Sequence, residues 1–280
     1  MTITNKIAIG CLVQWYEIEI IEEYLQSVKN AVDVIDNKEN VVIDLYFNCS
    51  QELEKVDEEQ ITMSDIKKRY DDLLEDMFGD LDYGGYNVNS YINEFSNVMY
   101  TIANYRRDFN NKYCTEVDVL MWGESDSLIP RQTFQILDNL QTAVKEKTPK
   151  YVTFFGTCKM WDDSWLPVEH TEFTDKPFVD GDTENWWSLR YNMTIDEMNK
   201  FNDKVEHLDI KTIHQYKLNG CGLVMSSDVV KSGVNIPNSS FFIHEDTAFM
   251  LQLQKMFQGV IPQYVIKNIL LVHNRKHNKK

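Results

Sequence analysis

The stretch Val117-Asp118-Val119-Leu120-Met121-Trp122-Gly123-Glu124-Ser125-Asp126 joins an apolar run to two carboxylates. The apolar run predicts a strand buried in a core. Because successive side chains of a strand point to opposite faces, Glu124 and Asp126 would leave the strand end on the same side. Two carboxylates in that position suit Mg²⁺ or Mn²⁺, and such an ion suits a diphosphate. A solvated strand end is the competing interpretation of the same acidic pair.

Three segments before this strand predict a βαβ unit. The apolar runs Ile7–Val13 and Val41–Phe47 are typical of strands buried on both faces. Between them, residues 20–32 place apolar side chains at helical spacing. A strand, a helix and a strand in this order predict parallel pairing with a right-handed crossover.

The segment 51–90 interrupts this alternation and is predicted to be an insertion. Its first residues are acidic and polar, and residues 65–77 fit an amphipathic helix. Residues 80–90 are rich in Asp, Gly, Tyr and Asn, which predicts a loop. A further helix is predicted over 91–109.

The second half of the chain continues with alternating helices and strands. Helices are predicted over 132–144, 194–206 and 244–257, and strands over 151–155, 221–225 and 265–272. Thr194 and Glu197 have the spacing of a capping box, and Gly259 is expected to close the helix that starts at His244. The alternating pattern predicts an α/β domain.

The composition excludes several classes of protein. The 280 residues are 43% hydrophobic with a net charge of −16, which fits a globular chain and argues against binding nucleic acid through overall charge. The five cysteines include no CxxC pair, so they predict neither a zinc ribbon nor a redox motif and fit a reducing compartment. The sequence shows no signal peptide and no apolar run long enough for a membrane helix, so a soluble, cytoplasmic protein is expected.

Three polar clusters fall at the ends of predicted elements. The first is Glu124-Ser125-Asp126, and the second is His244-Glu245-Asp246 at a helix start. The third is His273 after the last strand, followed by Arg275 and Lys276. Each has an ordinary interpretation, since acids at a helix start complement the helix dipole and a late histidine is often a surface residue. Their joint order and spacing supports the functional interpretation.

This order resembles that of GT-A fold glycosyltransferases and is similar to the family 2 type of nucleotide-diphospho-sugar transferases. Trp15-Tyr16-Glu17, leading to Leu25-Gln26-Ser27, resembles the segment after the first strand of that family. Glu124-Ser125-Asp126 is similar to the Asp-x-Asp motif, with Glu in place of the first Asp. Glu245-Asp246 resembles the Glu-Asp pair of the family, and His273 resembles its late metal-binding histidine.

The resemblance implies a GT-A, Rossmann-like fold. Its central sheet would be mixed and mostly parallel, flanked by helices, in a single domain with the insertion 51–90. Residues 1–130 would form the nucleotide-sugar-binding half. Residues 131–280 would form the acceptor-binding half and carry the basic C-terminal tail.

The resemblance also implies a metal-dependent, inverting hexosyl- or pentosyltransferase that uses a nucleotide diphosphate donor, with a UDP-sugar favoured, and an acceptor hydroxyl. Mn²⁺ or Mg²⁺ would be held by Glu124, Asp126 and His273. Asp246 is the expected catalytic base, with Glu245 as its rival. The residues expected at the donor are Trp15, Tyr16, Glu17, Asn48, Arg106, Glu124, Ser125, Asp126, Arg275 and Lys276. The residues expected at the acceptor are Trp161, Trp186, Trp187 and His244.

Alternatives to this function concern the acceptor and the activity itself. A glycan or small molecule is the default acceptor, but the same chemistry could act on hydroxymethylated DNA bases, as in phage-type DNA glycosylation. The net charge of −16 argues against DNA unless the basic tail contacts it. A sugar-nucleotide pyrophosphorylase would need a glycine-rich loop after the first strand, where Gly10 stands alone. A non-catalytic carbohydrate-binding protein is the third alternative, and the tryptophans of 161–187 fit either a sugar platform or a core.

Overall fold

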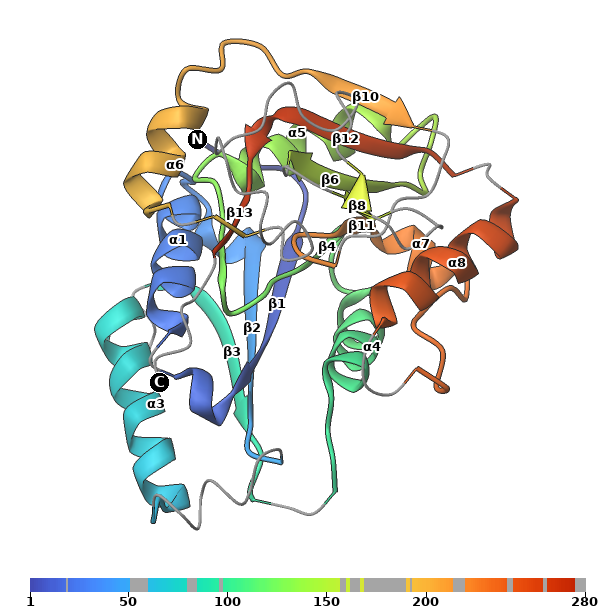
Figure 1. Cartoon of the computed structure of the whole chain (residues 1–280). Helices are drawn as coiled ribbons and strands as arrows, with labels where there is room; N and C mark the ends of the chain where they lie inside the picture. Colours follow the sequence, from blue (N-terminus) through green and yellow to red (C-terminus); the bar gives the residue numbers. More distant parts are fainter. Residues whose placement is uncertain are drawn as a thin grey trace.

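The computed structural model describes residues 1–18, 20–50, 60–79, 85–95, 98–156, 160–161, 167–168, 190–191, 193–213, 220–240, 244–258 and 261–274. An eight-stranded sheet forms the centre of the molecule, with the order β10-β12-β6-β11-β4-β1-β2-β3 (Figure 1). Its strands are β1 (Ile7–Gln14), β2 (Val41–Asn48), β3 (Asn87–Ile92), β4 (Val119–Trp122), β6 (Val152–Gly156), β10 (Ile210–Ile213), β11 (Val224–Ser226) and β12 (Gln263–Leu270).

The sheet is mixed and mostly parallel, which confirms the predicted fold class. Strands β3, β2, β1 and β4 run parallel to one another, and β6 runs parallel to β12. Strand β11 is antiparallel to β4 and β6, and β10 is antiparallel to β12. A second, three-stranded sheet has the order β5-β13-β9, formed by β5 (Ser127–Leu128), β13 (Val272–Asn274) and β9 (Arg190–Tyr191). A third sheet pairs β7 (Met160–Trp161) with β8 (Pro167–Val168).

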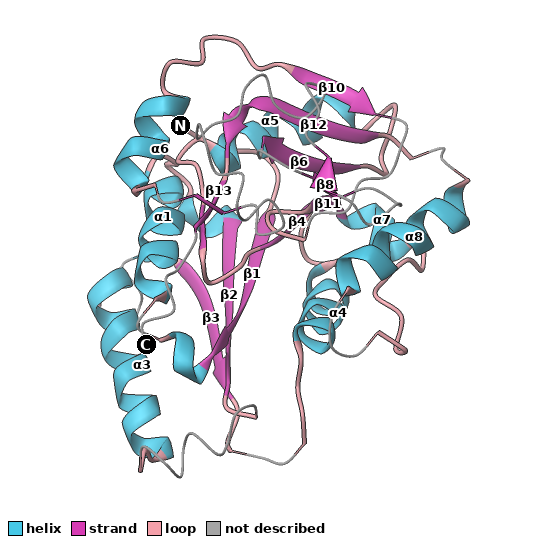
Figure 2. Ribbon diagram, viewed as in Figure 1, coloured by secondary structure: helices cyan, strands magenta, loops and turns pink. Residues whose placement is uncertain are grey.

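The helices divide between the two faces of the sheet (Figure 2). Helices α1, α3 and α5 pack in one hydrophobic core, and α4, α7 and α8 pack in the other. The predicted capping box of Thr194 and Glu197 is present at the start of α6. The helices and 3-10 turns are η1 (Trp15–Glu17), α1 (Ile21–Asp33), η2 (Lys38–Asn40), α3 (Met63–Phe78), α4 (Ile102–Tyr113), α5 (Thr133–Val144), α6 (Ile195–Asn202), α7 (Ser227–Lys231) and α8 (Glu245–Phe257).

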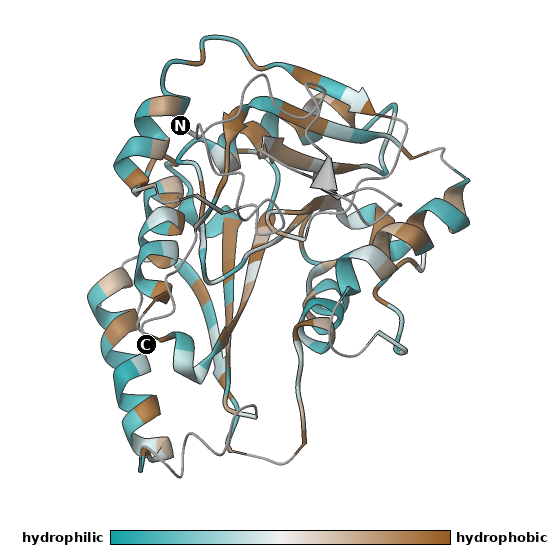
Figure 3. Ribbon diagram, in the orientation of Figure 1, coloured by the Kyte–Doolittle hydropathy of each residue, from teal (hydrophilic) through white to brown (hydrophobic). Residues whose placement is uncertain are grey.

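Strand β1 contributes side chains to both cores. Ile7 and Ile9 lie in the core of α1, α3 and α5, whereas Ala8 and Leu12 lie in the core of α4, α7 and α8. A strand covered on both faces needs apolar residues at every position, which explains its continuous apolar run. Figure 3 shows hydrophobic residues along β1 and β2, and a mixture of hydrophilic and hydrophobic residues on the helices.

The segment 51–90, predicted as an insertion, adds a helix and an edge strand to the domain. Helix α3 follows Thr62, whose hydroxyl accepts a hydrogen bond from the backbone N–H of Asp65 (3.2 Å). Strand β3 then pairs in parallel with β2. The loop predicted for 80–90 is therefore wrong over 87–90. The polar, partly exposed side chains of this edge strand hide it from a search for apolar runs.

Helix α4 begins later than the helix predicted over 91–109. Residues 91 and 92 belong to β3, and the described residues between β3 and Ile102 are not helical, so the prediction is wrong before Ile102. Thr101 caps α4, because its hydroxyl accepts a hydrogen bond from the backbone N–H of Asn104 (3.4 Å), and the Asn104 side chain accepts one in return (3.1 Å). This reciprocal cap sets the first turn of the helix.

The predicted strands of the second half are present with shifted ends. The strand predicted over 221–225 is β11, which starts later because the preceding residues form a turn against β4. In this turn the backbone N–H of Gly222 donates to the carbonyl of Trp122 (3.1 Å). The strand predicted over 265–272 is two strands, β12 and β13, separated at Leu271. The edge strand β10, whose residues are mostly exposed, was not predicted.

Gly10 lies where β1 and α4 come closest, and its replacement tests this packing. A Cβ atom at Gly10 would stand 2.5 Å from Cδ2 of Phe109 and 2.7 Å from the Tyr105 hydroxyl. We expect Gly10→Ala to lower the free energy of unfolding by about 1–3 kcal/mol through overpacking. Urea denaturation measures the loss. In a Phe109→Leu background the same change should cost less, and an equal cost in both backgrounds would contradict the proposed clash.

Asp33 links α1 to η2 and to the residue before β3, and it predicts a pH dependence of stability. Its carboxylate accepts hydrogen bonds from Lys29 Nζ (2.8 Å), Lys38 Nζ (2.6 Å) and the Tyr86 hydroxyl. Burial opposes ionisation, but these partners lower the pKa of Asp33 from 3.8 to about 2. The carboxylate therefore stabilises the fold above about pH 4, and the contribution is lost as the pH falls toward about 2.

We expect Asp33→Asn to lower the free energy of unfolding by about 1 kcal/mol or less at neutral pH, because water screens this largely accessible group. Urea denaturation at decreasing pH should show the difference from the wild type shrinking. Asp71→Asn, on the exposed side of α3, is the control. A loss that stays constant from neutral to acidic pH would show that the charge of Asp33 is not its cause.

Candidate active site

The acidic motif forms a tight turn directly after β4. Strand β4 ends at Trp122, and the backbone N–H of Ser127 donates to the carbonyl of Glu124 (3.0 Å), which closes the turn. Glu124 and Asp126 therefore do not continue the strand, and the prediction that strand alternation places them on one side is wrong. Their side chains nevertheless converge, because the turn leads into β5 and Ser127 pairs with His273 of β13.

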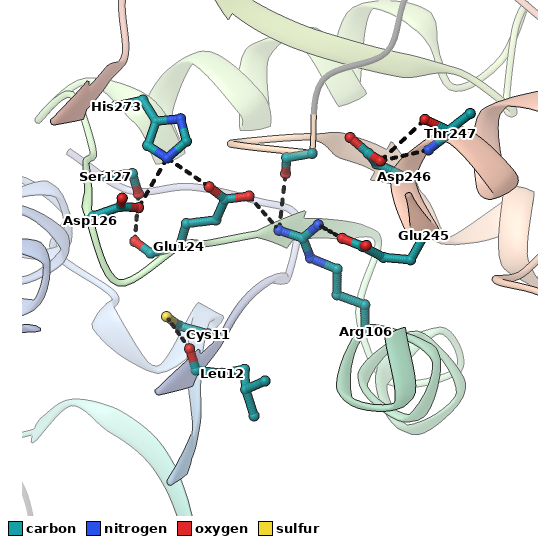
Figure 4. A network of polar contacts seen from close by, with 11 residues as sticks. Cys11, Leu12, Arg106, Glu124, Asp126, Ser127, Glu245, Asp246, Thr247 and His273 are labelled. Carbon is teal, nitrogen blue, oxygen red and sulfur yellow. Dashed lines mark hydrogen bonds and ion pairs between the residues drawn. The ribbon is translucent and has the colours of Figure 1, made fainter. Parts of the chain in front are cut away.

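His273 stands between the two carboxylates (Figure 4). Its Nε2 atom lies 3.0 Å from Oε2 of Glu124 and 3.0 Å from Oδ1 of Asp126. Burial lowers the pKa of His273, but Cys221 and the two carboxylates raise it, and the net pKa is well above 6.5. Carboxylate oxygens are ligands that Mn²⁺ and Mg²⁺ accept, and here two carboxylates lie against the same imidazole nitrogen. The structure thus brings together the three residues predicted to bind a metal.

Arg106 of α4 is buried beneath this cluster, with 2% of its surface exposed. The Nη2 atom of its guanidinium donates to Oε1 of Glu124 (2.8 Å) and to the carbonyl of Gly220 (3.3 Å). Its Nη1 atom pairs with Glu245. The guanidinium also lies over the ring of Trp122, 4.8 Å from the ring centre. One cation thereby connects the acidic turn with the start of α8.

Burial and the guanidinium of Arg106 shift the pKa values of Glu124 and Glu245 in opposite directions. Burial alone would raise the pKa of Glu124, but His273 and Arg106 hold it well below its usual value. Burial raises the pKa of Glu245, although Arg106 opposes that rise. Glu124 is thus held as a carboxylate with each of its oxygens facing a different partner.

The first turn of α8 carries both candidates for the base. His244 precedes the helix, is exposed, and has a left-handed backbone with φ of 62°. Glu245 is buried and ion-paired with Arg106. Asp246 is half-buried, and its Oδ1 accepts a hydrogen bond from the backbone N–H of Thr247 (2.7 Å). The two acids therefore differ in access and in their partners.

Gly220 separates Arg106 from Asp246. A Cβ atom at this position would stand 2.7 Å from Nη1 of Arg106 and 3.1 Å from Oδ2 of Asp246. A larger residue would push the guanidinium or the aspartate from its place. Neither this glycine nor the neighbouring Cys221 was predicted as a site residue. The sulfur of Cys221, a carboxylate oxygen of Glu124 and a ring nitrogen of His273 lie within 4.8 Å of one another. The sequence feature that marks this site is Gly220-Cys221-Gly222, a cysteine between two glycines just before a strand.

The residues predicted after β1 and β2 differ in exposure. Trp15 is 3% exposed and packs in a small apolar cluster with Cys49, whereas Tyr16 is 38% exposed. The carboxylate of Glu17 accepts a hydrogen bond from the backbone N–H of Gln14 (3.0 Å). Asn48 is fully buried, and its amide donates to the Gln14 side chain (2.9 Å) and the Tyr100 carbonyl (2.7 Å).

Several predicted site residues lie outside the described residues. These are Trp186, Trp187, Arg275 and Lys276, together with Gly259, which was predicted to close α8. Trp161 belongs to β7, but its side chain is not described. Their roles stay predictions. Ser125, between Glu124 and Asp126, is buried.

The mixed, mostly parallel sheet flanked by helices matches the GT-A, Rossmann-like fold. No family model matches this chain, and no curated protein matches it. Among solved structures, TarS residues 1–349 from S. aureus is similar over 96% of this chain and 60% of its own, with a TM-score of 0.54 and 11% identity.

A second S. aureus TarS structure matches 96% of this chain with a TM-score of 0.52 and 13% identity. This chain spans only 37% of that one. Glucosyl-3-phosphoglycerate synthase from Mycobacterium tuberculosis, in complex with Mn²⁺, UDP and phosphoglyceric acid, has a TM-score of 0.45 and 11% identity over 98% of this chain and 72% of its own. At these identities the similarity to TarS shows the fold alone. Within the described part of the chain, the helices are too short or too polar to cross a membrane.

Arg106 should be the most sensitive position of the site. Arg106→Met removes the cation that pairs with the buried Glu245 and leaves Glu124 with His273 as its partner, so we expect it to lower the free energy of unfolding by about 3–5 kcal/mol. In a Glu245→Gln background the same change should cost clearly less. Urea denaturation of the wild type, the two single variants and the double variant measures the coupling free energy between Arg106 and Glu245.

Arg107 provides a matched control one residue along α4. It donates hydrogen bonds to the carbonyls of Ile236 (2.8 Å), Pro237 (2.8 Å) and Ser240 (3.1 Å) and to no carboxylate among its recorded bonds. Arg107→Met should show no coupling to Glu245→Gln. Equal coupling at both arginines would contradict a specific bridge by Arg106.

Proposed function

We propose that this chain is a metal-dependent, inverting glycosyltransferase that moves a sugar from a nucleotide diphosphate donor to an acceptor hydroxyl. The observation that carries the proposal is the convergence of Glu124, Asp126 and His273 at one point, linked through Arg106 to the acids that open α8. The GT-A fold supports a donor site at this edge of the sheet.

The charge of the site favours a bound divalent cation. The site gathers four carboxylates, of Glu124, Asp126, Glu245 and Asp246, around one arginine and one histidine. Arg106 pairs with Glu124 and Glu245, and His273 lies against Glu124 and Asp126. This excess of negative charge attracts cations, and the oxygen and imidazole ligands of the turn and β13 fit Mn²⁺ or Mg²⁺. When bound, the metal would supply positive charge against the phosphates of the donor.

Asp246 is the better candidate for the general base. A base must reach the acceptor hydroxyl, and Asp246 is half-buried whereas Glu245 is 6% exposed and paired with Arg106. The hydrogen bond from Thr247 to Oδ1 fixes the orientation of the Asp246 carboxylate (2.7 Å). Glu245 then positions Arg106, and through it Glu124.

The donor nucleoside would lie toward the ends of β1 and β2. Tyr16 is the exposed aromatic residue there and is proposed to stack on the base, while the buried Trp15 and Asn48 shape the segment around it. UDP is the proposed nucleotide, and Arg275 and Lys276 are proposed to bind its diphosphate. The proposed acceptor is a glycan or small molecule, and the proposed location is the cytoplasm.

Replacement of Asp246 tests the function directly. Asp246→Asn should retain metal-dependent donor binding and lower the turnover rate by about 10²–10⁴-fold, because only proton removal is lost. Release of UDP from a panel of UDP-sugars, with an acceptor library, measures turnover, and calorimetry measures donor binding. Asp196→Asn, an exposed acid in the first turn of α6, is the matched control.

Glu245→Gln should behave differently from Asp246→Asn. It should weaken the fold, as measured by urea denaturation, because it breaks the ion pair with Arg106. Full turnover in Asp246→Asn would rule out this aspartate as the base. Absence of turnover in the wild-type chain with all donors, together with absent donor binding, would favour a non-catalytic protein.

A further inference from the structure

Cys221 lies beside two of the three side chains proposed above to bind the metal, Glu124 and His273. Its sulfur, a carboxylate oxygen of Glu124 and an imidazole nitrogen of His273 all lie within 4.8 Å of one another. Cys221 is 5% exposed, so its side chain is inside the protein. Within the described residues, this is the group of His, Cys, Asp and Glu side chains whose ligand atoms come close enough to share one ion.

The backbone fixes Cys221 relative to the acidic turn. The N–H of Gly222 donates to the carbonyl of Trp122 (3.1 Å), and the N–H of Trp122 donates to the carbonyl of Leu223 (2.9 Å). These two bonds attach the two residues that follow Cys221 to Trp122, which stands two positions before Glu124. Gly222 has a φ of +69°, a conformation that favours glycine and closes the turn next to Cys221.

The sulfur changes which ions the site prefers. Zn²⁺ binds a thiolate at about 2.3 Å and imidazole nitrogen or carboxylate oxygen at about 2.0–2.2 Å, so its ligands stand about 3–4 Å apart. Small side-chain rotations would bring the three ligand atoms from within 4.8 Å to that spacing. Mg²⁺ takes oxygen ligands and gains nothing from a thiolate.

We infer that Cys221 is a sulfur ligand of this metal site, together with Glu124 and His273, and that it makes the site select Zn²⁺ or Co²⁺ over Mg²⁺. The inference rests on the proposed function only for the claim that this site is the donor site. When the sulfur–metal bond forms, the S–H bond breaks and its proton passes to solvent. Asp126 remains beside His273 as a further oxygen ligand or hydrogen-bond acceptor.

Cobalt reports a sulfur ligand directly, through a sulfur-to-cobalt charge-transfer band in the near ultraviolet. We expect Co²⁺ titration of the full chain to produce this band and Cys221→Ser to abolish it. Cys11→Ser is the matched control, because Cys11 is also buried but is not in the ligand group, and it should keep the band. Competition with a chromophoric chelator should show at least a tenfold loss of Zn²⁺ affinity in Cys221→Ser, with Mg²⁺ affinity unchanged.

Cobalt binding without the band in the wild-type chain would overturn the inference, and so would a band that persists in Cys221→Ser. Cys221→Ala provides a second variant if the serine variant does not fold, and the wild-type spectrum decides by itself if neither folds. Mn²⁺-dependent UDP binding is measured on the same protein. Its absence would contradict the proposed function, whereas the cobalt band would still decide whether Cys221 is a ligand.

Discussion

The buried guanidinium of Arg106 is the charge on which the site depends. Placing an ion inside a protein costs several kcal/mol, and this cost is offset only when the surrounding groups pair with it well. Glu124 and Glu245 supply that pairing from two parts of the chain that are distant in sequence. In return, the guanidinium keeps these acids close to each other in spite of their mutual repulsion. The positions of α4, the acidic turn and the start of α8 are therefore interdependent.

Strand topology explains how the other groups reach this cation. Strand β4 lies between β1 and β11, so the turn after Trp122 opens at the carboxyl end of the parallel strands. Strand β13 pairs with β5, which follows the same turn, and this register places His273 against both carboxylates. Residues from the middle and the end of the chain thus meet because backbone pairing fixes them, and the side chains need little further ordering.

The sequence predicts the features that depend on local pattern. Strands β1, β2 and β4 are apolar on both faces, so they are visible as continuous runs, whereas the edge strands β3 and β10 are too polar to be found this way. The cluster of Glu124, Asp126 and His273 could be predicted from its resemblance to a family, but the strand geometry first assumed for the two acids was wrong. Arg106 could be predicted as a site residue, but its bridge from the acidic turn to α8 could not, because that bridge depends on where α4 lies relative to both. The position of Cys221 beside Glu124 and His273 depends on the pairing of β11 with β4, which local pattern does not show.

The most direct test of this account is calorimetric titration of nucleoside diphosphates into the full chain, with and without Mn²⁺. We expect one of them, UDP by preference, to bind only when the metal is present, and we expect Asp126→Asn or His273→Ala to weaken this binding strongly. Binding that is equally tight without metal, or that is unaffected by either substitution, would contradict the assignment of a metal-dependent donor site to this cluster.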